Sequence, residues 1–444
     1  MSKLRLGFYG DDFTGSVDVL LQVARRGWTG RLFTQLPDTE TLRAAAQRCD
    51  AVGVAGIARS LSTEQLEAEV RPVLTALASL DPQVLQYKAC STADSSPHVG
   101  SLGRALEIGR AVVGQQTARG EQPVPMLFAQ PDFGRYTAFG HHFAREGETV
   151  YRLDRQPTMS SHPVTPMDES DLAVHLGRQT ELGIGSLPFT AYSSVADVTQ
   201  QIRESDVAGL VLDALGEQHL RLLGQALLDL GGFAIGSGGL SHALAAAEPG
   251  QAGPVPMATP ARGPVLAVSG SRSAQTRRQI DAAARAGWMT APLVVGRSGS
   301  GEHSTAEHST AEHSASEHSL RERVLAALAA GQSVALSSDD ADTSGLAAQE
   351  VLPALASAAA GMVEAAVRAG VGRAIVCGGD TSSRVTTLLG VESLSIAANP
   401  TGNVVLLRAH AADPAVDGLE LLLKGGQVGD VDLFEQIRTL DTGV

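Results

Sequence analysis

Short apolar runs alternate with stretches of helical periodicity along the first half of the chain. The apolar runs fall at residues 4–10, 51–57, 84–90, 207–213 and 232–236, and helical patterns fall between them at 15–26, 63–79, 99–113, 170–181 and 217–229. Runs that are apolar throughout are typical of strands buried on both faces. Buried strands that alternate with helices predict a parallel, doubly wound α/β sheet.

A segment without periodicity interrupts this alternation. Residues 246–264 are rich in Pro, Gly and Ala, which is typical of a linker. A second alternation follows, with apolar runs at 264–271, 332–338, 373–378, 403–408 and 419–424. We therefore expect two α/β domains, each built on a largely parallel sheet: residues 1–250, a linker at 251–263, and residues 264–444.

A five-residue repeat lies inside the second alternation. It covers residues 301–319 and spaces His303, His308, His313 and His318 evenly. Four histidines suggest a metal site, but five-residue steps turn a helix by about 500°, so these side chains would not share one face. The repeat is otherwise small and polar, with nothing to bury. We expect an exposed insertion, disordered, frayed or weakly helical, rather than a metal site.

Composition and charge narrow the functional classes. The chain has 444 residues, a net charge of -14 and only 4% aromatic residues. Nucleic-acid binding requires clustered Lys and Arg, and no such stripe occurs, so we expect no nucleic-acid partner. Cys49, Cys90 and Cys377 are scattered, which favours a reducing compartment over a disulfide framework. No leader and no apolar run of about 18 residues is recognisable, so we expect a cytoplasmic protein without a membrane partner.

The candidate chemistry lies in polar loops that follow predicted strands, where open parallel sheets bind their ligands. Asp11 and Asp12 follow the first strand, and Lys88 precedes STADSSPHVGS after the third. In the second half the corresponding loops are SGSRSAQT, SSDDADT, CGGDTSSR and KGGQVG. Each loop alone is explained by helix capping, since caps prefer Ser, Thr, Asp and Gly. Six such loops at six strand ends favour a ligand site.

Lysine is rare and its positions are informative. The chain contains only Lys3, Lys88 and Lys424, and the last two stand where a strand meets a polar or Gly-rich loop. A lysine at a strand end either extends its charge into solvent or binds phosphate. The glycines after Lys424 favour phosphate, because they let backbone N–H groups approach a ligand closely.

Common catalytic signatures are absent from the sequence. It has no GxxxxGK[ST], GxGxxG, GxSxG or HExxH motif. The pattern that remains is phosphoryl transfer outside the common motifs. Gly-rich backbone and a lysine would hold phosphates, carboxylates would bind Mg²⁺, and one Asp could accept a hydroxyl proton.

Five segments together resemble one family. GDDFTGSVD, YKACSTADSSP, VSGSRSAQTRRQI, CGGDTSSRV and LLLKGGQVGDVDLF look, in that order, like the landmarks of the four-carbon acid-sugar kinase family. The resemblance covers nearly the whole chain except the His repeat. It implies an N-terminal domain that binds a small sugar acid, a C-terminal domain that binds ATP with Mg²⁺, and an active site in the cleft between them. The phosphoryl acceptor would be a terminal hydroxyl, as in kinases for threonate, erythronate, 3-oxo-tetronate or 3-oxo-isoapionate.

Carried over residue by residue, the resemblance assigns two sets of binding residues. The ATP set is Ser269, Ser271, Gly378, Gly379, Asp380, Thr381, Lys424, Gly425, Gly426 and Gln427. The substrate set includes Lys88, Asp94 and Ser95. Here the sequence departs from the usual Asp-Ser-Thr-Leu-Arg-Gly loop and lacks its Arg, a natural partner for a carboxylate. Arg59, Arg135 and Arg155 are candidates to replace it, so the exact acid stays open.

Asp11 and Asp12 are the candidate catalytic residues. Adjacent carboxylates cannot both stay ionised and unpaired at low cost, so a cation or a substrate hydroxyl would relieve them. They serve substrate hydroxyls, Mg²⁺ or general base catalysis, and the sequence does not divide these roles; the metal ligands stay unassigned. A plain N-cap role for Asp12 is the structural alternative.

Other functions also remain compatible with the sequence. A non-catalytic sugar-acid sensor of the same fold is one, and a phosphatase or lyase acting on phosphorylated acids is another. The sequence leaves both a monomer and a homo-oligomer open.

Overall fold

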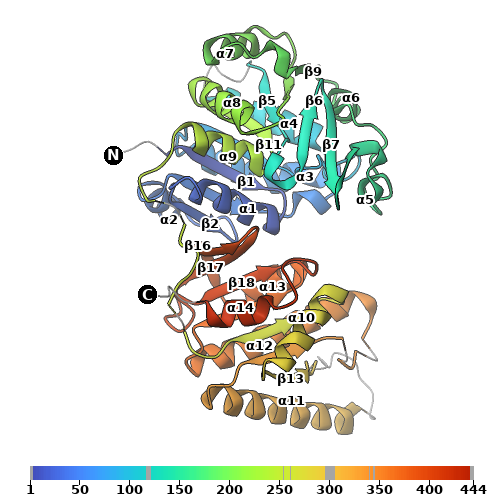
Figure 1. The fold of residues 1–444 in the computed structure, drawn as a ribbon, viewed down its shortest axis with the longest axis vertical. Coiled ribbons are helices and arrows are strands. Elements are labelled where there is room, and N and C mark those ends of the chain that lie inside the picture. Colours follow the sequence, from blue (N-terminus) through green and yellow to red (C-terminus); the bar gives the residue numbers. More distant parts are fainter. Residues whose placement is uncertain are drawn as a thin grey trace. The chain divides into compact units, whose positions relative to one another are not determined.

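The chain divides into two compact units in a computed structural model, which describes residues 4–116, 122–253, 255–260, 262–295, 306–339, 341–343 and 346–440. The first unit is Met1–Pro254 and the second is Val255–Val444. Each unit has a sheet and a hydrophobic core of its own (Figure 1).

The first unit is built on a parallel sheet. Its strand order is β2-β3-β1-β4-β11-β5-β10-β9, and neighbouring strands run parallel. Gly10, the last residue of β1, pairs with Ala55 on one side and Lys88 on the other. The strands are β1 (Leu6–Gly10), β2 (Gly30–Phe33), β3 (Ala51–Ala55), β4 (Val84–Lys88), β5 (Val124–Leu127), β9 (Ile184–Leu187), β10 (Gly209–Leu212) and β11 (Gly232–Gly236).

Helices cover both faces of this sheet. α1, α9, α8 and α7 pack in a row on one face, while α3, α4 and α6 pack on the other (Figure 1). The chain leaves β1 toward β2 but crosses from β3 over β1 to β4, so the carboxyl ends of β1 and β4 form a topological switch point. The helices are α1 (Phe13–Ala24), α2 (Thr39–Ala46), α3 (Thr63–Ala78), α4 (Leu102–Gln116), α5 (Pro157–Ser160), α6 (Leu172–Gly177), α7 (Val195–Glu204), α8 (Glu217–Leu230) and α9 (Gly238–Ala247).

A small antiparallel sheet interrupts the alternation of this unit. It consists of β6 (Arg135–Ala138), β7 (His141–Glu146) and β8 (Thr149–Arg152). It has a separate small core of Ala144, Leu153, Met159 and Met167. No apolar pattern in the sequence predicts this sheet, because its strands are short and largely polar.

The second unit also carries a mostly parallel sheet, in the order β13-β14-β12-β15-β18-β17-β16. Only β17 runs antiparallel to its neighbours β18 and β16. The strands are β12 (Leu266–Ser269), β13 (Met289–Pro292), β14 (Val334–Ser337), β15 (Arg373–Cys377), β16 (Val391–Thr401), β17 (Val404–Ala411) and β18 (Glu420–Lys424). The helices are α10 (Ala274–Arg285), α11 (Ala306–Ala329), α12 (Ala348–Arg368), α13 (Gly379–Leu388) and α14 (Leu433–Thr439). α10 packs on α14, while α12 packs on α11 and α13. The two-domain α/β fold expected from the sequence is therefore confirmed.

Of the states expected for the His repeat, the described part of it is helical. α11 begins at Ala306, inside the repeat, and continues without a break to Ala329. The Ala and Glu of the repeat favour helix, and Leu320, Val324 and Leu328 beyond it are buried and anchor the same helix. Residues 315–319 are exposed, as expected, whereas His303 lies outside the described residues.

One helix in the described part of the chain is long and apolar enough to cross a membrane. It covers Gln349–Arg368 within α12, with a hydropathy of 1.4. Half of it is buried inside the protein, as in an ordinary core helix, so it is weak evidence for a membrane span.

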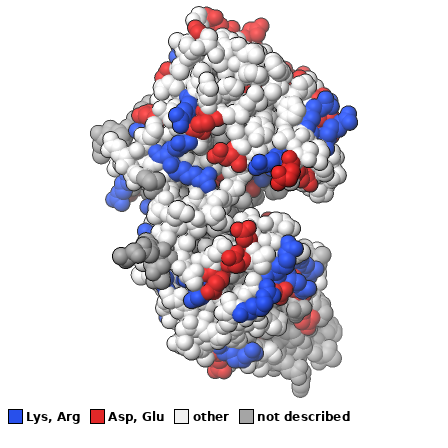
Figure 2. Space-filling model, in the orientation of Figure 1, with Lys and Arg blue, Asp and Glu red and all other residues white. Residues whose placement is uncertain are grey.

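On the face drawn in Figure 2, small groups of acidic and basic side chains alternate across the surface.

Candidate functional site

Arg59 holds the two candidate catalytic acids together. Its Nε and Nη2 donate to Asp11 at 3.2 and 2.7 Å, and its Nη1 and Nη2 donate to Asp12 at 2.9 and 2.8 Å. The Asp11 side chain is almost fully buried at 2% exposure, whereas Asp12 is 30% exposed. One guanidinium therefore relieves both carboxylates, and of the two acids Asp12 is the one accessible to a ligand.

Local structure explains this geometry. β1 is buried along its whole length, so Asp11 emerges from the core directly beside Lys88 at the end of β4. Asp12 is the N-cap of α1 and accepts from the N–H of Gly15 at 2.8 Å. Arg59 lies on the short 3₁₀ turn Ala58–Ser60 after β3, and its N–H donates to the Asp11 carbonyl.

Burial and charge act in opposite directions on this cluster. Burial raises the pKa of Asp11, and the Arg59 charge offsets only part of that effect. Burial alone would lower the pKa of Arg59, but Asp11, Cys90 and Asp12 together raise it well above its ordinary value. Arg59, Asp11 and Asp12 therefore form one ionic cluster, here called the Arg59 clamp, in which the Asp11 carboxyl group is buried.

Gly15 is the point at which the charged groups converge. A Cβ atom added there would lie 2.4 Å from Asp12 Oδ1, 2.9 Å from Lys88 Nζ and 3.5 Å from Arg59 Nη2. Lys88 is buried, and its Nζ donates one hydrogen bond to the Ala89 carbonyl at 2.7 Å. A carboxylate and an ammonium thus face the same small space at the switch point, where the N-terminus of α1 also favours anions.

The loop after β4 places Asp94 and Ser95 beside other polar side chains. Thr165 donates its hydroxyl to Asp94 Oδ1, and His162 Nδ1 lies 3.9 Å from the same oxygen. Ser95 is buried and contacts His175 at 3.2 Å.

The two remaining candidate arginines differ. Arg135 starts β6 and donates from Nη1 to the Phe133 carbonyl at 2.5 Å, while its buried Nε has no partner among the described residues. Arg155 is 75% exposed and pairs with Asp154. None of its described contacts involves the clamp.

Three loops of the second unit come together around glycines. The Gly270 N–H donates to the Cys377 carbonyl at 3.0 Å, and the Gly378 N–H donates to the Lys424 carbonyl at 2.8 Å. Gly378 has a φ of +114°, which side chains rarely adopt. A Cβ at Gly426 would meet Ser271 Oγ at 2.4 Å. The strand ends carrying Ser269, Ser271, Gly378 and Lys424 are therefore adjacent, as the nucleotide assignment requires.

Lys424 and the start of α13 supply positive potential to these loops. Lys424 is buried and donates to Thr276 Oγ1 at 3.1 Å. Burial lowers its pKa, and neighbouring Cys377 opposes that shift. Gly379 and Asp380 are exposed in the first turn of α13, while Thr381 is buried against Gly270. A helix N-terminus next to an ammonium group is well suited to phosphate. Gly425 and Gln427 complete the loop after β18.

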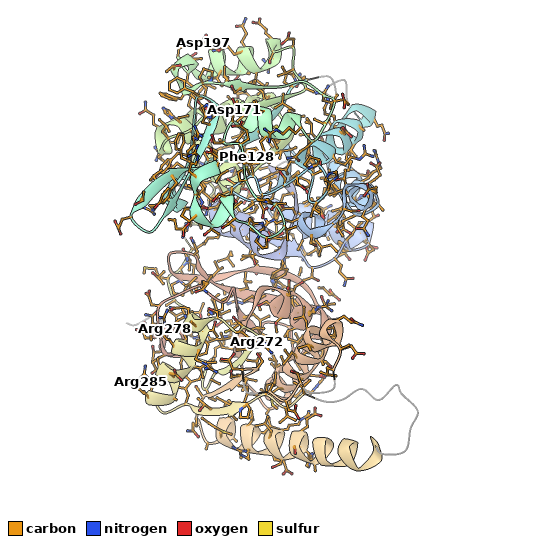
Figure 3. All side chains as sticks on the ribbon, turned by 90° about the vertical axis from the view of Figure 1, so that its right-hand side faces the viewer. Phe128, Asp171, Asp197, Arg272, Arg278 and Arg285 are labelled. Carbon is orange, nitrogen blue, oxygen red and sulfur yellow. The ribbon has the colours of Figure 1, made fainter. Side chains whose placement is uncertain are left out.

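Sequence reasoning missed several residues that shape this region. Thr276 Oγ1 and Ser273 Oγ both donate to the Gly426 carbonyl, at 2.8 and 2.9 Å. Gln279 Nε2 contacts three successive carbonyls from Val428 to Asp430. Arg272, labelled in Figure 3, is exposed in the loop after β12. The clustering of Ser, Thr, Gln and Arg in SGSRSAQTRRQ was the available signal.

A magnesium ion fits one acid of these sites better than the others. Arg59 already engages both Asp11 and Asp12, so a cation there would have to displace a guanidinium. Asp380 is exposed in the first turn of α13, beside the loops that follow β12 and β18. Mg²⁺ in kinase sites commonly takes one or two carboxylates plus phosphate oxygens. Within the described ranges, no three His, Cys, Asp or Glu side chains gather as a metal cluster.

Comparisons with known proteins agree with this division of the chain. Residues 6–244 match the model of a sugar-binding N-terminal domain, and residues 266–434 match that of a nucleotide-binding C-terminal domain. The chain is also 38% identical to the 3-oxo-isoapionate kinase of Paraburkholderia graminis, over 98% of this chain and 94% of the relative. The chain belongs to the four-carbon acid-sugar kinase family.

Other members and solved structures extend the comparison. The 3-oxo-tetronate kinase of Pectobacterium atrosepticum is 28% identical over 98% of this chain and 99% of its own. A Salmonella typhimurium protein described as a putative tRNA synthase superposes with a TM-score of 0.77 at 24% identity, over 98% of this chain and 99% of that chain. A Haemophilus influenzae protein superposes with a TM-score of 0.76 at 22% identity, over 97% of this chain and 99% of that chain. The two solved structures share the fold.

Membership confirms the enzyme class that the motifs predicted, a sugar-acid kinase. It weighs against the sensor, phosphatase and lyase alternatives. The roles of individual residues remain predictions.

Proposed function

We propose that this four-carbon acid-sugar kinase transfers the γ-phosphoryl group of ATP to the terminal hydroxyl of a small sugar acid of the 3-oxo-isoapionate type. The observation that carries the proposal is the convergence of Asp12, Lys88 and the Arg59 clamp around Gly15, at the switch point of the sugar-binding unit. The 38% identity to a 3-oxo-isoapionate kinase favours a branched acid over a linear one.

The acid-binding residues divide by charge. One N–H of the Lys88 ammonium donates a hydrogen bond to the Ala89 carbonyl, and the other two are suited to the carboxylate of the substrate. This role replaces the arginine missing from the loop after β4. Asp12, the exposed member of the pair, accepts the hydrogen bond of the attacking hydroxyl. Asp11 stays buried and fixes Arg59, which in turn orients Asp12.

The nucleotide residues act by positioning and by electrostatics. Backbone N–H groups at Gly379–Thr381 and Gly425–Gln427, with the Lys424 ammonium, are suited to the phosphates. A Mg²⁺ ion at Asp380 would neutralise charge on the transferred group. Phosphoryl transfer passes through a loose transition state, so alignment contributes more than strong base catalysis.

The decisive test is a coupled ADP-release assay across four- and five-carbon acids, including 3-oxo-isoapionate and 3-oxo-tetronate. Acid-dependent ADP release supports a kinase, and ligand binding without turnover on any acid would favour the sensor. Asp12→Asn retains a good N-cap but loses the charge, and should slow turnover by about 10²–10⁴-fold while ATP affinity by calorimetry is unchanged. Asp11→Asn should loosen Arg59 and mainly raise the KM for the acid.

A further inference from the structure

The loop Cys90–Ser95, here called the acid loop, carries the candidate substrate residues Asp94 and Ser95. It follows Lys88 at the end of β4, so its shape decides where those side chains lie. Ala93 in this loop has a φ of +49°, a left-handed conformation that costs a non-glycine residue about 1 kcal/mol or more. Such a loop keeps one shape only if neighbouring groups hold it.

Polar side chains from one segment of the chain hold Asp94 and Ser95 of the acid loop, and Ala93 packs in the main hydrophobic core. This segment runs from β6 to Gln179, just past α6, and includes the small antiparallel sheet. Its polar side chains reach the acid loop at Asp94 and Ser95.

Asp94 is fixed by Thr165. The buried Thr165 hydroxyl donates to Asp94 Oδ1, because an ionised carboxylate can only accept. Thr165 is itself held, since its N–H donates to His162 Nδ1 at 3.1 Å. No other described group donates to Asp94, so its second carboxylate oxygen is available as an acceptor.

Ser95 is fixed from α6. Its hydroxyl donates to the Ala93 carbonyl at 2.8 Å, across the strained residue. Its oxygen accepts from Gln179 Nε2 at 2.9 Å, and His175 Nε2 lies 3.2 Å away. Asp171, labelled in Figure 3, caps α6 by accepting from Ala173 N at 2.9 Å, and so sets the position of His175 one turn later.

His142 of β7 belongs to the same segment and is fully buried. His142 Nδ1 pairs with Thr137 Oγ1 at 2.9 Å, while Nε2 completes no hydrogen bond in the described structure. Burial lowers the pKa of His142 to about 3, which the Ser91 backbone only partly opposes, so the ring is neutral. A buried polar atom without a partner costs about 1–3 kcal/mol, which apolar packing would avoid.

We propose that Thr165 and His175 are positioning residues that fix the acid loop so that Asp94 receives a hydroxyl of the sugar acid. The inference rests on the proposed function and deepens it. The substrate class is a polyhydroxylated acid that keeps at least one hydroxyl for Asp94 besides the hydroxyl that is phosphorylated. Packing alone does not explain this arrangement. The Thr165 hydroxyl donates to one oxygen of Asp94, and the other oxygen can still accept a hydrogen bond from a ligand.

Thr165→Val tests the proposal with little change of shape. Loss of the hydroxyl frees Asp94 to turn, and the KM for the acid should rise about 10–100-fold, the usual effect of losing one hydrogen bond to a charged group. kcat should change less, and the KM for ATP should not change. Thr165→Ser restores the hydroxyl and should recover the KM to within about threefold of wild type.

Thr158→Val is the matched control. It lies in the same segment, but its hydroxyl donates to Glu146 and it is exposed. Wild-type acid KM in Thr165→Val, or equal loss in Thr158→Val, would overturn the proposal. Calorimetric titration of the acids into wild type and Thr165→Val separates this outcome from failure of the proposed function. If wild type binds an acid without turnover, the kinase assignment fails while the affinity difference still tests the positioning role. If no acid binds, both fail.

Discussion

A methyl group added at Gly15 probes the charged cluster without removing any of its members. Gly15 lies in the first turn of α1, and the added Cβ would be 2.4 Å from Asp12 Oδ1 and 2.9 Å from Lys88 Nζ. Non-bonded contacts of Cβ below about 3 Å are essentially not observed, so the carboxylate must retreat by about 0.6–1 Å. The ammonium must shift as well. We expect Gly15→Ala to damage catalysis far more than folding.

The stability terms nearly cancel. Alanine gains up to about 1 kcal/mol over glycine in a helix, and less in the first turn. Displacing Asp12 weakens its hydrogen bond to the Gly15 N–H, a cap contact contributing about 1 kcal/mol. The free energy of unfolding should therefore change by less than about 1 kcal/mol, or about 2–4 °C in Tm for a unit of this size.

The catalytic effect is larger, because a misplacement of about 1 Å typically costs about 10²-fold in rate. The assay is steady-state ADP release with the preferred acid, together with thermal and urea denaturation. Gly361→Ala is the control: it lies in α12, a Cβ there meets nothing within 4 Å, and the change should stabilise slightly without affecting kinetics. Wild-type kcat and KM in Gly15→Ala would refute the placement of the acid site at this point. A fall in Tm of more than about 10 °C would refute the cancellation argument.

Three further predictions follow from other parts of the chain. Lys424→Met keeps the buried aliphatic stem but removes the ammonium, and should reduce kcat/KM for ATP by about 10²–10³-fold with Tm nearly unchanged; normal turnover with a low Tm would make Lys424 structural. Because the folded pKa of His142 is lowered to about 3, its contribution to stability is complete above pH 6.5 and declines as pH falls from 6.5 toward 3. Between pH 7 and 4.5 this residue should lower the free energy of unfolding by about 2–3 kcal/mol. The free energy of unfolding from urea melts should fall with pH by that amount in wild type but not in His142→Gln. Replacing residues 301–313 by a Gly-Ser linker should leave the KM for ATP and kcat within about twofold, and a larger loss would show that the repeat histidines matter.

The central strands of both units were predictable because burial on both faces leaves an unbroken apolar run. β1, β3, β4 and β11 correspond to such runs, and nearly all of their residues are buried. Edge strands such as β2, β9 and β13 are partly exposed and carry a weaker signal. β5 contains Pro125, which ordinarily argues against a central strand. The polar strands β6–β8 gave no signal at all.

The candidate site was predictable only in part, because its contacts join distant segments. Adjacency alone pointed to Asp11 and Asp12, whereas the contact of both acids with Arg59, 48 and 47 residues away, could not be predicted. Thr165 is 71 residues from Asp94, in a segment without an apolar pattern. No local periodicity records such pairings. The contacts that hold the acid loop become apparent only in the folded structure, where distant segments lie next to it.

The continuity of α11 has a consequence for how this gene can vary. Each five-residue unit added to the helical part of the repeat would lengthen the helix by about 7.5 Å. The packing of Leu320, Val324 and Leu328 further along would stay as it is. Tandem duplication or loss of repeat units should therefore be close to selectively neutral, and strains of one species should differ in repeat number while their core residues are unchanged.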